Sequence, residues 1–318
     1  MNENELVAAF AQILAAPKNT KIVLGIGDDA AAWKPSRSHL SVITCDALIE
    51  DIHFTRAAFS FEEIGYRALA SNLSDIAAMG AQPILATVAL GIGPGISTNE
   101  LLDLYRGIDS LARTSKTAIA GGDIVRTQKL MLTIAVVGEV RASNMKRRSG
   151  ARNKDILAVT GPLGASRAGL DGDHSEEAHR KHRTPPPRLL EGRWLGGSQS
   201  VHAMMDLSDG LAMDVPRMAR ASGLAAIIEQ VPVAQAARAM AGSRGNDPQH
   251  YVLEAGEDFE LLVAVAPRAF THLSQRFQKR FGRPLLQIGR VHEGSGVTVR
   301  KGDLLEPLQE TGWDHLAQ

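Results

Sequence analysis

This chain of 318 residues is poor in cysteine, net charge and long apolar segments. Its single cysteine, Cys45, excludes an internal disulfide framework and any metal site built from several cysteines. Lys+Arg and Asp+Glu both number 35, so no global field favours nucleic acid, and we expect no nucleic-acid partner. The longest apolar runs, such as residues 84–92, are shorter than a membrane span, and the acidic N-terminal residues do not resemble a secretion signal. We therefore expect a cytoplasmic protein without a membrane partner.

The chain also lacks the two common glycine-rich nucleotide signatures. No G-x-x-x-x-G-K-[ST] sequence occurs, which disfavours a P-loop kinase. The chain also shows no G-x-G-x-x-G followed by a strand lysine, the pattern that would indicate a protein kinase. The nearest phosphate-binding candidate is Gly161–Ser166, whose small residues precede a predicted helix N-terminus, a natural anion site. An ordinary strand-to-helix turn is the better interpretation of that segment.

Composition and length favour a globular protein of about two domains. Hydrophobic residues make up 44% and charged residues 22%, which supplies an ample core. Both halves mix strand-like and helix-like segments, so we predict two α/β domains joined near residues 141–150. We take residues 1–145 as the N-terminal domain and residues 146–318 as the C-terminal domain.

Two helices have clear start signals. Ser60–Glu63 and Ser97–Glu100 are both typical of capping boxes, and the first helix should end near Gly80. Further helices are predicted over residues 188–196, 209–222 and 267–281. Pro216 lies inside the second of these and should kink it or mark its true start.

Short runs rich in β-branched and apolar residues predict strands. They cover residues 21–24, 40–44, 84–92, 117–120, 130–140, 155–160, 203–207, 259–266, 285–292 and 297–300. The segment Asp171–Pro187 is polar and ends in three prolines, so we expect an exposed loop. Its histidines, His174, His179 and His182, should be exposed to solvent rather than bound to a metal.

Aspartates recur beside Gly, Ser or Thr, mostly at the ends of the predicted strands. The five clusters are Gly27–Ala30, Thr44–Asp46, Asn72–Asp75, Gly121–Asp123 and Asp206–Gly210. Loops at strand ends converge on ligands in α/β proteins, and Mg²⁺ prefers carboxylate oxygens shared with substrate phosphates. Each cluster taken alone is more simply explained by turn chemistry. That explanation is weaker for Asp75, because its cluster lies inside a predicted amphipathic helix.

The ordered motifs of the whole chain resemble those of the thiamine-monophosphate kinase family, within the aminoimidazole ribonucleotide synthetase-like superfamily. The matching segments are GIGDDAA (25–31), TCD with His53 (44–53), NLSDIAAMGAQP (72–83), GGD (121–123), KRRSGA (146–151), GPLGASRAGL (161–170), MDLSDGL (205–211), EAGEDFELL (254–262) and GWDHL (312–316). The chain departs from the family pattern at Cys45, where Thr is commoner, and at Ala255, where Gly is usual.

The resemblance implies a two-domain α/β protein of the α+β type, whose N-terminal domain binds ATP and Mg²⁺ and dimerises through its sheet. The C-terminal domain would complete the active site. The implied reaction is direct in-line, Mg²⁺-assisted transfer from ATP to thiamine monophosphate, with several Mg²⁺ ions, in thiamine diphosphate biosynthesis.

The resemblance also implies roles for particular residues. Positions matching metal ligands are Asp29, Thr44, Cys45 (through its backbone), Asp46, Asp75, Asp123, Asp206 and Asp209. Positions matching ATP contacts are Gly122, Asp123, Arg148, Ser208 and Tyr105. Positions matching contacts to thiamine monophosphate are His53, Glu257 and Trp313. Among these, Asp75, Asp123, Asp209 and Arg148 are the predicted catalytic residues.

Two other functions stay open on the sequence alone. One is a different ATP-using enzyme of the superfamily, but a hydrogenase maturation protein would carry a C-terminal cysteine, which this chain does not. A selenophosphate synthetase would need a reactive N-terminal cysteine, and the cysteine here lies within a metal motif. The other is a nucleotide-binding regulatory protein without turnover, which would have little use for so many like charges.

Overall fold

A computed structural model describes residues 3–14, 21–26, 30–254 and 256–312. The chain divides into two units, one formed by Met1–Ile76 and Ala81–Ala142 and the other by Ala77–Gly80 and Ser143–Gln318. No helix within the described ranges has the length and apolarity needed to cross a membrane. Each unit combines helices with a mixed sheet.

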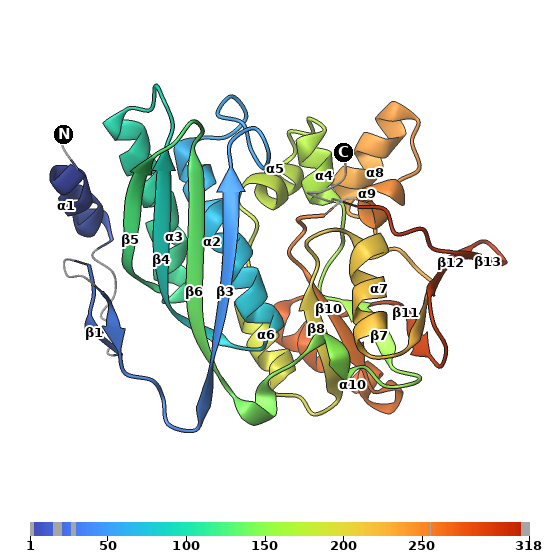
Figure 1. The fold of residues 1–318 in the computed structure, drawn as a ribbon. Coiled ribbons are helices and arrows are strands. Elements are labelled where there is room, and N and C mark those ends of the chain that lie inside the picture. Colours follow the sequence, from blue (N-terminus) through green and yellow to red (C-terminus); the bar gives the residue numbers. More distant parts are fainter. Residues whose placement is uncertain (1–2, 15–20, 27–29, 255, 313–318) are drawn as a thin grey trace. The chain divides into compact units, whose positions relative to one another are not determined.

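The N-terminal unit is built on a sheet with the strand order β3–β6–β4–β5, in which only β4 and β5 are parallel neighbours. Figure 1 shows α2 and α3 on one face of this sheet. The elements are α1 (Glu3–Ile13), β1 (Ile22–Leu24), β2 (Ala32–Trp33), β3 (His39–Ile49), α2 (Phe61–Ala78), β4 (Gln82–Ile92), α3 (Thr98–Ser115), β5 (Ala118–Arg126) and β6 (Met131–Arg141).

Both predicted capping boxes are confirmed. At the start of α2 the Glu63 amide donates to the Ser60 hydroxyl, and the Ser60 amide donates to the Glu63 carboxylate. Ser97 and Glu100 form the same reciprocal pair at the start of α3. α2 ends just before Gly80, whose φ of 69° is readily adopted only by glycine.

Two glycines allow α2 and α3 to pack closely. A β-carbon on Gly65 would lie 1.9 Å from the Leu104 carbonyl oxygen, and one on Gly107 would lie 1.9 Å from that of Glu62. Leu69 and Leu73 of α2 and Ile134 of β6 are fully buried. Burying each such side chain stabilises the fold by roughly 1.5–3 kcal/mol relative to exposing it.

The C-terminal unit is built on a sheet with the order β13–β12–β9–β11–β7–β10–β8, antiparallel except between β12 and β9. Its elements, after the short turn η1 (Ala142–Asn144), are η2 (Arg148–Gly150), β7 (Ile156–Val159), α4 (Ala165–Leu170), α5 (Glu176–Arg183), α6 (Leu189–Gly196), β8 (Val201–Asp206), α7 (Leu211–Ala221), β9 (Ala225–Ile228), α8 (Gln235–Arg244), α9 (His250–Leu253), β10 (Leu261–Val265), α10 (Pro267–Phe281), β11 (Leu286–His292), β12 (Val297–Lys301) and β13 (Leu304–Pro307).

The predicted exposed loop over residues 171–187 is wrong, because its middle forms α5. Ser175 caps this helix by accepting a hydrogen bond from the Ala178 amide. The buried face carries Ala178, Lys181 and His182, and both His182 and Lys181 are only 5% exposed. Helical periodicity was hidden because the inward positions hold polar residues. His174 and His179 are exposed, as expected.

Two further points concern Pro216 and the aspartates. α7 begins at Leu211 and contains the buried Pro216, so of the two alternatives for this proline the structure excludes the start of the helix. Asp46 and Asp123 lie within β3 and β5 rather than at strand ends, because both strands run several residues beyond the predicted segments.

Candidate active site

In the N-terminal unit, β3 and α2 bring three predicted metal-site residues together. The Thr44 hydroxyl on β3 donates to the Asp75 carboxylate on α2 over 2.5 Å. Two residues along the strand, the Asp46 amide donates to the side-chain oxygen of Asn72 over 3.1 Å. The helical position of Asp75 therefore serves to place its carboxylate against the strand, which turn chemistry would not require.

Asp46 and Asp75 also interact electrostatically. Burial and then the Asp75 charge raise the pKa of Asp46 to about 6, while a hydrogen bond with Ser71 opposes the change. A bound cation would offset this repulsion, and hydroxyl and carboxylate oxygens are the hard ligands that Mg²⁺ prefers. The donor set of Thr44, Asp46 and Asp75 therefore fits magnesium. This set has only two carboxylates, because its third donor is a threonine. Over the described ranges, no group of three or more His, Cys, Asp or Glu is placed so that it could hold a metal ion.

Strand geometry separates Cys45 from its neighbours. Successive side chains of a strand point to opposite faces, so the Cys45 thiol lies on the other face of β3 from Thr44 and Asp46. The thiol is exposed. A contribution from Cys45 to the same site would have to come from its backbone.

A cavity of about 850 Å³ lies in the N-terminal unit, lined by β4, β5, α1 and α3. It brings together Tyr105, Gly122 and Asp123, three residues predicted to contact ATP. Tyr105 is buried and stacks on Phe10 of α1 with ring centroids 3.6 Å apart, and this burial raises the pKa of its hydroxyl. At Gly122 a β-carbon would lie 2.0 Å from the Val88 carbonyl oxygen, so glycine is needed for β4 and β5 to pair here.

His53 follows β3 in a tight turn. Its amide donates to the Ile49 carbonyl over 2.9 Å, and its Nδ1 accepts the Ile49 amide over 3.1 Å. Since Nδ1 acts as an acceptor, the neutral ring carries its proton on Nε2. The ring is therefore oriented by the backbone, with Nε2 as the hydrogen-bond donor.

In the C-terminal unit, the loop after β8 carries the second set of predicted residues. Asp206, at the end of β8, is 3% exposed. The Ser208 and Asp209 amides donate to one oxygen of Asp214 over 3.2 and 3.1 Å. Arg217 donates to the carboxylates of both Asp209 and Asp214. Burial raises the pKa of the fully buried Asp214 to about 6.

The segment bearing Glu257 packs directly on this loop. The Glu257 amide donates to the Ser208 carbonyl over 2.8 Å, and the Phe259 amide donates to the Leu207 carbonyl over 3.1 Å. Glu257 and Phe259 have φ values of 64° and 48°, which for non-glycine residues costs about 1–3 kcal/mol each. Such strain persists only where the surroundings enforce it.

Arg148 is exposed in η2, and its backbone is tied to α7. The Ser222 hydroxyl donates to the Arg148 carbonyl over 3.0 Å and accepts the Ala151 amide over 3.2 Å. A β-carbon on Gly150 would lie 2.0 Å from the His202 carbonyl oxygen. The backbone around Arg148 is therefore fixed while its guanidinium is free to reach a ligand in solution.

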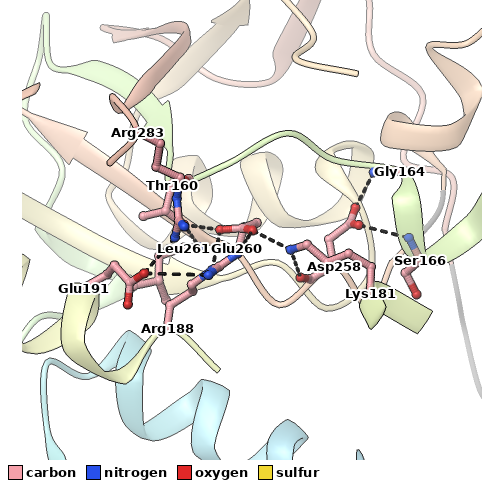
Figure 2. Close-up of polar contacts among 10 residues, drawn as sticks. All are labelled: Thr160, Gly164, Ser166, Lys181, Arg188, Glu191, Asp258, Glu260, Leu261 and Arg283. Carbon is pink, nitrogen blue, oxygen red and sulfur yellow. Dashed lines mark hydrogen bonds and ion pairs between the residues drawn. The ribbon is translucent and has the colours of Figure 1, made fainter. Parts of the chain in front are cut away.

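The possible anion site at Gly161–Ser166 is occupied by the protein's own carboxylate. The Gly164 and Ser166 amides donate to Asp258 over 2.6 and 3.3 Å, as Figure 2 shows. The interpretation of this segment as a strand-to-helix turn is confirmed, since β7 ends at Val159 and α4 begins within the segment, at Ala165.

Three residues named from the sequence, Asp29, Trp313 and Ala255, lie outside the described ranges. Conversely, sequence reasoning missed Asp214, Arg217 and Lys181. The only signal for Asp214 and Lys181 would have been a charged residue at an inward-facing position of a predicted helix, and α5 was not predicted at all.

Comparison with known proteins covers both units. The family described as AIR synthase related protein matches with its N-terminal domain over residues 27–140 and its C-terminal domain over residues 155–302. A thiamine-monophosphate kinase of Rhodopirellula baltica is 34% identical over 290 residues, which is 88% of this chain and 87% of the relative.

Solved structures also match this chain over nearly its whole length. The thiamine-monophosphate kinase from Stenotrophomonas maltophilia superposes with a TM-score of 0.83 at 31% identity, covering 94% of this chain and 96% of that one. The structure of AaThiL complexed with AMPPCP and TMP has a TM-score of 0.76 at 27% identity, covering 99% of this chain and 97% of that one. The fold predicted from the motifs is confirmed.

Proposed function

The chain belongs to the thiamine-monophosphate kinase family, and we propose that it transfers the γ-phosphoryl group of ATP to thiamine monophosphate by a direct in-line reaction assisted by Mg²⁺. The observation that carries the proposal is the similarity, over almost the whole chain, to a structure complexed with AMPPCP and TMP. The products are ADP and thiamine diphosphate, and the reaction belongs to thiamine diphosphate biosynthesis in the cytoplasm.

The chemistry explains why the candidate site is rich in carboxylates and needs no evident general base. The acceptor is a phosphate, which is already ionised at neutral pH. The main barrier is therefore the approach of two anions, which metal ions and arginine can offset. When bound, Mg²⁺ would supply this positive charge, held by Thr44, Asp46 and Asp75 and by the other predicted ligands Asp29, Cys45 (backbone), Asp123, Asp206 and Asp209.

ATP would use the cavity beside β5. Tyr105 and Phe10 supply an apolar wall for a base, and the bare backbone at Gly122 lets a ligand approach Asp123 closely. Arg148 would pair with phosphate oxygens, where a planar guanidinium binds two oxygens at once. Ser208 would add a hydroxyl donor.

Thiamine monophosphate has a cationic thiazolium ring and an anionic phosphate. Glu257 and Trp313 suit the ring, through charge and an aromatic face. His53 would donate from Nε2 to the phosphate, because its Nδ1 is already bonded to the Ile49 amide. We assign ATP and metal binding and homodimerisation through the sheet to residues 1–145, and completion of the site to residues 146–318.

The direct test is an assay of purified protein with Mg-ATP and thiamine monophosphate, in which ADP and thiamine diphosphate are measured by chromatography. We expect both products in equal amounts, with much less from free thiamine as the control acceptor. ATP binding without any thiamine diphosphate would contradict the proposal and favour a nucleotide-binding regulatory protein. Loss of turnover on chelation of Mg²⁺, restored by adding it back, would support the metal assignment.

A further inference from the structure

The strained residues Glu257 and Phe259 alternate with two buried carboxylates, Asp258 and Glu260. Asp258 is 3% exposed and Glu260 is fully buried. The backbone amides of the strained pair bond toward Ser208 and Leu207, on the loop after β8. The side chains of the buried pair instead form hydrogen bonds with residues in the segment between β7 and α6. The four-residue segment 257–260 thus links the candidate substrate residue to a distinct polar cluster.

Figure 2 shows that Lys181 of α5 reaches this segment directly. Its ammonium donates to the Asp258 carbonyl oxygen over 3.0 Å and also to the Glu260 carboxylate. Lys181 therefore contacts both the backbone between the two strained residues and the side chain that follows them. It is 5% exposed, so these bonds form away from water.

The other partners of Glu260 do not reach the strained backbone in this way. Arg188, at the start of α6, donates two hydrogen bonds to the Glu260 carboxylate, and Thr160 donates a third over 2.6 Å. Burial disfavours ionisation of Glu260, but Lys181 and Arg188 hold its pKa well below the usual range. Since Arg188 neutralises Glu260, replacing Lys181 would still leave the buried carboxylate paired.

A buried ammonium is costly to desolvate, and an apolar side chain of similar length would fill the same space. What an apolar side chain cannot do is hold the Asp258 carbonyl, and so fix the peptide between two residues in the left-handed region. We propose that Lys181 is a positioning residue for the acceptor side of the site, fixing the 257–259 backbone so that Glu257 is held ready for thiamine monophosphate. This inference rests on the proposed function.

The test compares Lys181→Met with Lys181→Arg and with Asp155→Asn as a matched control. Asp155 forms another buried pair in the same unit, with His202 at 2.8 Å. Small misplacements of a binding group cost about tenfold or more, so for Lys181→Met we expect the KM and Kd for thiamine monophosphate to rise by about tenfold. The KM for ATP should change by less than about twofold. Lys181→Arg, which keeps the charge and a donor, should recover most of the affinity.

Asp155→Asn should lower the thermal stability while leaving the ratio of the two KM values unchanged. If Lys181→Met behaves like Asp155→Asn, with lower stability but no selective effect on thiamine monophosphate, the positioning role is wrong. Should Lys181→Met fail to fold, the double variant Lys181→Met/Glu260→Gln removes both charges together and should show the same selective rise in KM. Unchanged kinetics in that variant would overturn the inference.

A separate readout distinguishes failure of this inference from failure of the proposed function. Amide hydrogen exchange at residues 257 and 259 reports the segment whether or not the protein is a kinase. We expect faster exchange at both amides in Lys181→Met than in the wild type or in Asp155→Asn. Wild-type protein that neither binds nor phosphorylates thiamine monophosphate would contradict the proposed function, whereas unchanged exchange would contradict the role of Lys181.

Discussion

The guanidinium of Arg217 donates to the carboxylate of Asp209, a predicted Mg²⁺ ligand on the loop after β8. The same nitrogen donates to Asp214 over 2.8 Å. The backbone of the loop also has hydrogen bonds of its own, since the Ser208 and Asp209 amides donate to Asp214 and the Glu257 amide donates to the Ser208 carbonyl. Arg217 therefore acts on Asp209 mainly as a counter-ion.

Removal of this counter-ion should strengthen metal binding. For Arg217→Gln we expect the affinity for Mn²⁺, measured by electron paramagnetic resonance, to rise by roughly threefold to tenfold, as Coulomb repulsion at short range in a hydrated site predicts. Arg220→Gln is the control, since Arg220 lies on the same helix but pairs with Glu310. A fall in affinity would show instead that Arg217 orients Asp209.

Asp75 is the residue whose loss should affect turnover most. Asp75→Asn keeps the size of the side chain but removes the charge that faces Asp46 and accepts from Thr44. If it is a shared metal ligand, kcat should fall by about 100-fold or more, in the range seen when a charge-stabilising group is lost. Circular dichroism should be unchanged. Asp103→Asn, at an exposed site on α3, serves as control, and a near-normal rate for Asp75→Asn would exclude the ligand role.

The hydrogen bond between Ser222 and the Arg148 backbone predicts a smaller effect, on the KM for ATP. Ser222→Ala removes the hydroxyl that bridges the Arg148 carbonyl and the Ala151 amide. Loss of about 1 kcal/mol of hydrogen bonding should raise the KM for ATP by roughly threefold to fivefold. Ser222→Thr, which keeps a hydroxyl, should stay near the wild type. An equal effect of both variants would show that the hydroxyl is not what matters.

The two buried carboxylates beside Lys181 predict pH effects of opposite sign. Burial raises the pKa of Asp258 to about 6, so its contribution to stability is present at low pH and is lost as pH rises through about 6. Asp258→Asn cannot ionise, so its stability relative to the wild type should improve by roughly 2–3 kcal/mol between pH 4 and pH 8. Urea unfolding at both pH values measures this, and a constant difference would contradict it.

Glu260 should show the reverse behaviour. Because the pKa of Glu260 is lowered in the folded state, its ionised carboxylate stabilises the fold at pH values above about 4.5. This contribution is lost as the pH falls toward the folded-state pKa. The deficit of Glu260→Gln relative to the wild type should therefore be largest at neutral pH and shrink in acid. The same urea titrations give this comparison, and a deficit that grows in acid would mean that Glu260 is not held ionised.

Local sequence signals were reliable where the determining contacts are near in the chain. The capping boxes at Ser60 and Ser97 fixed the starts of α2 and α3, because both partners lie within one helical turn. The helix over Pro267–Phe281 was predicted at its observed bounds. By contrast, β9, α8 and α9 were not predicted, since their buried faces consist of small residues or of a mixture of residue types.

The motif series by itself determined the family and hence the fold of both units, because it runs in order through nearly the whole chain. It also named Thr44, Asp46 and Asp75, but not the arrangement that joins them across β3 and α2. Only the tertiary structure decided that α5 is a helix with an inward Lys181. The reason is physical: a buried lysine is stable only beside partners such as Glu260 and the Asp258 carbonyl, which lie 79 and 77 residues away in the chain.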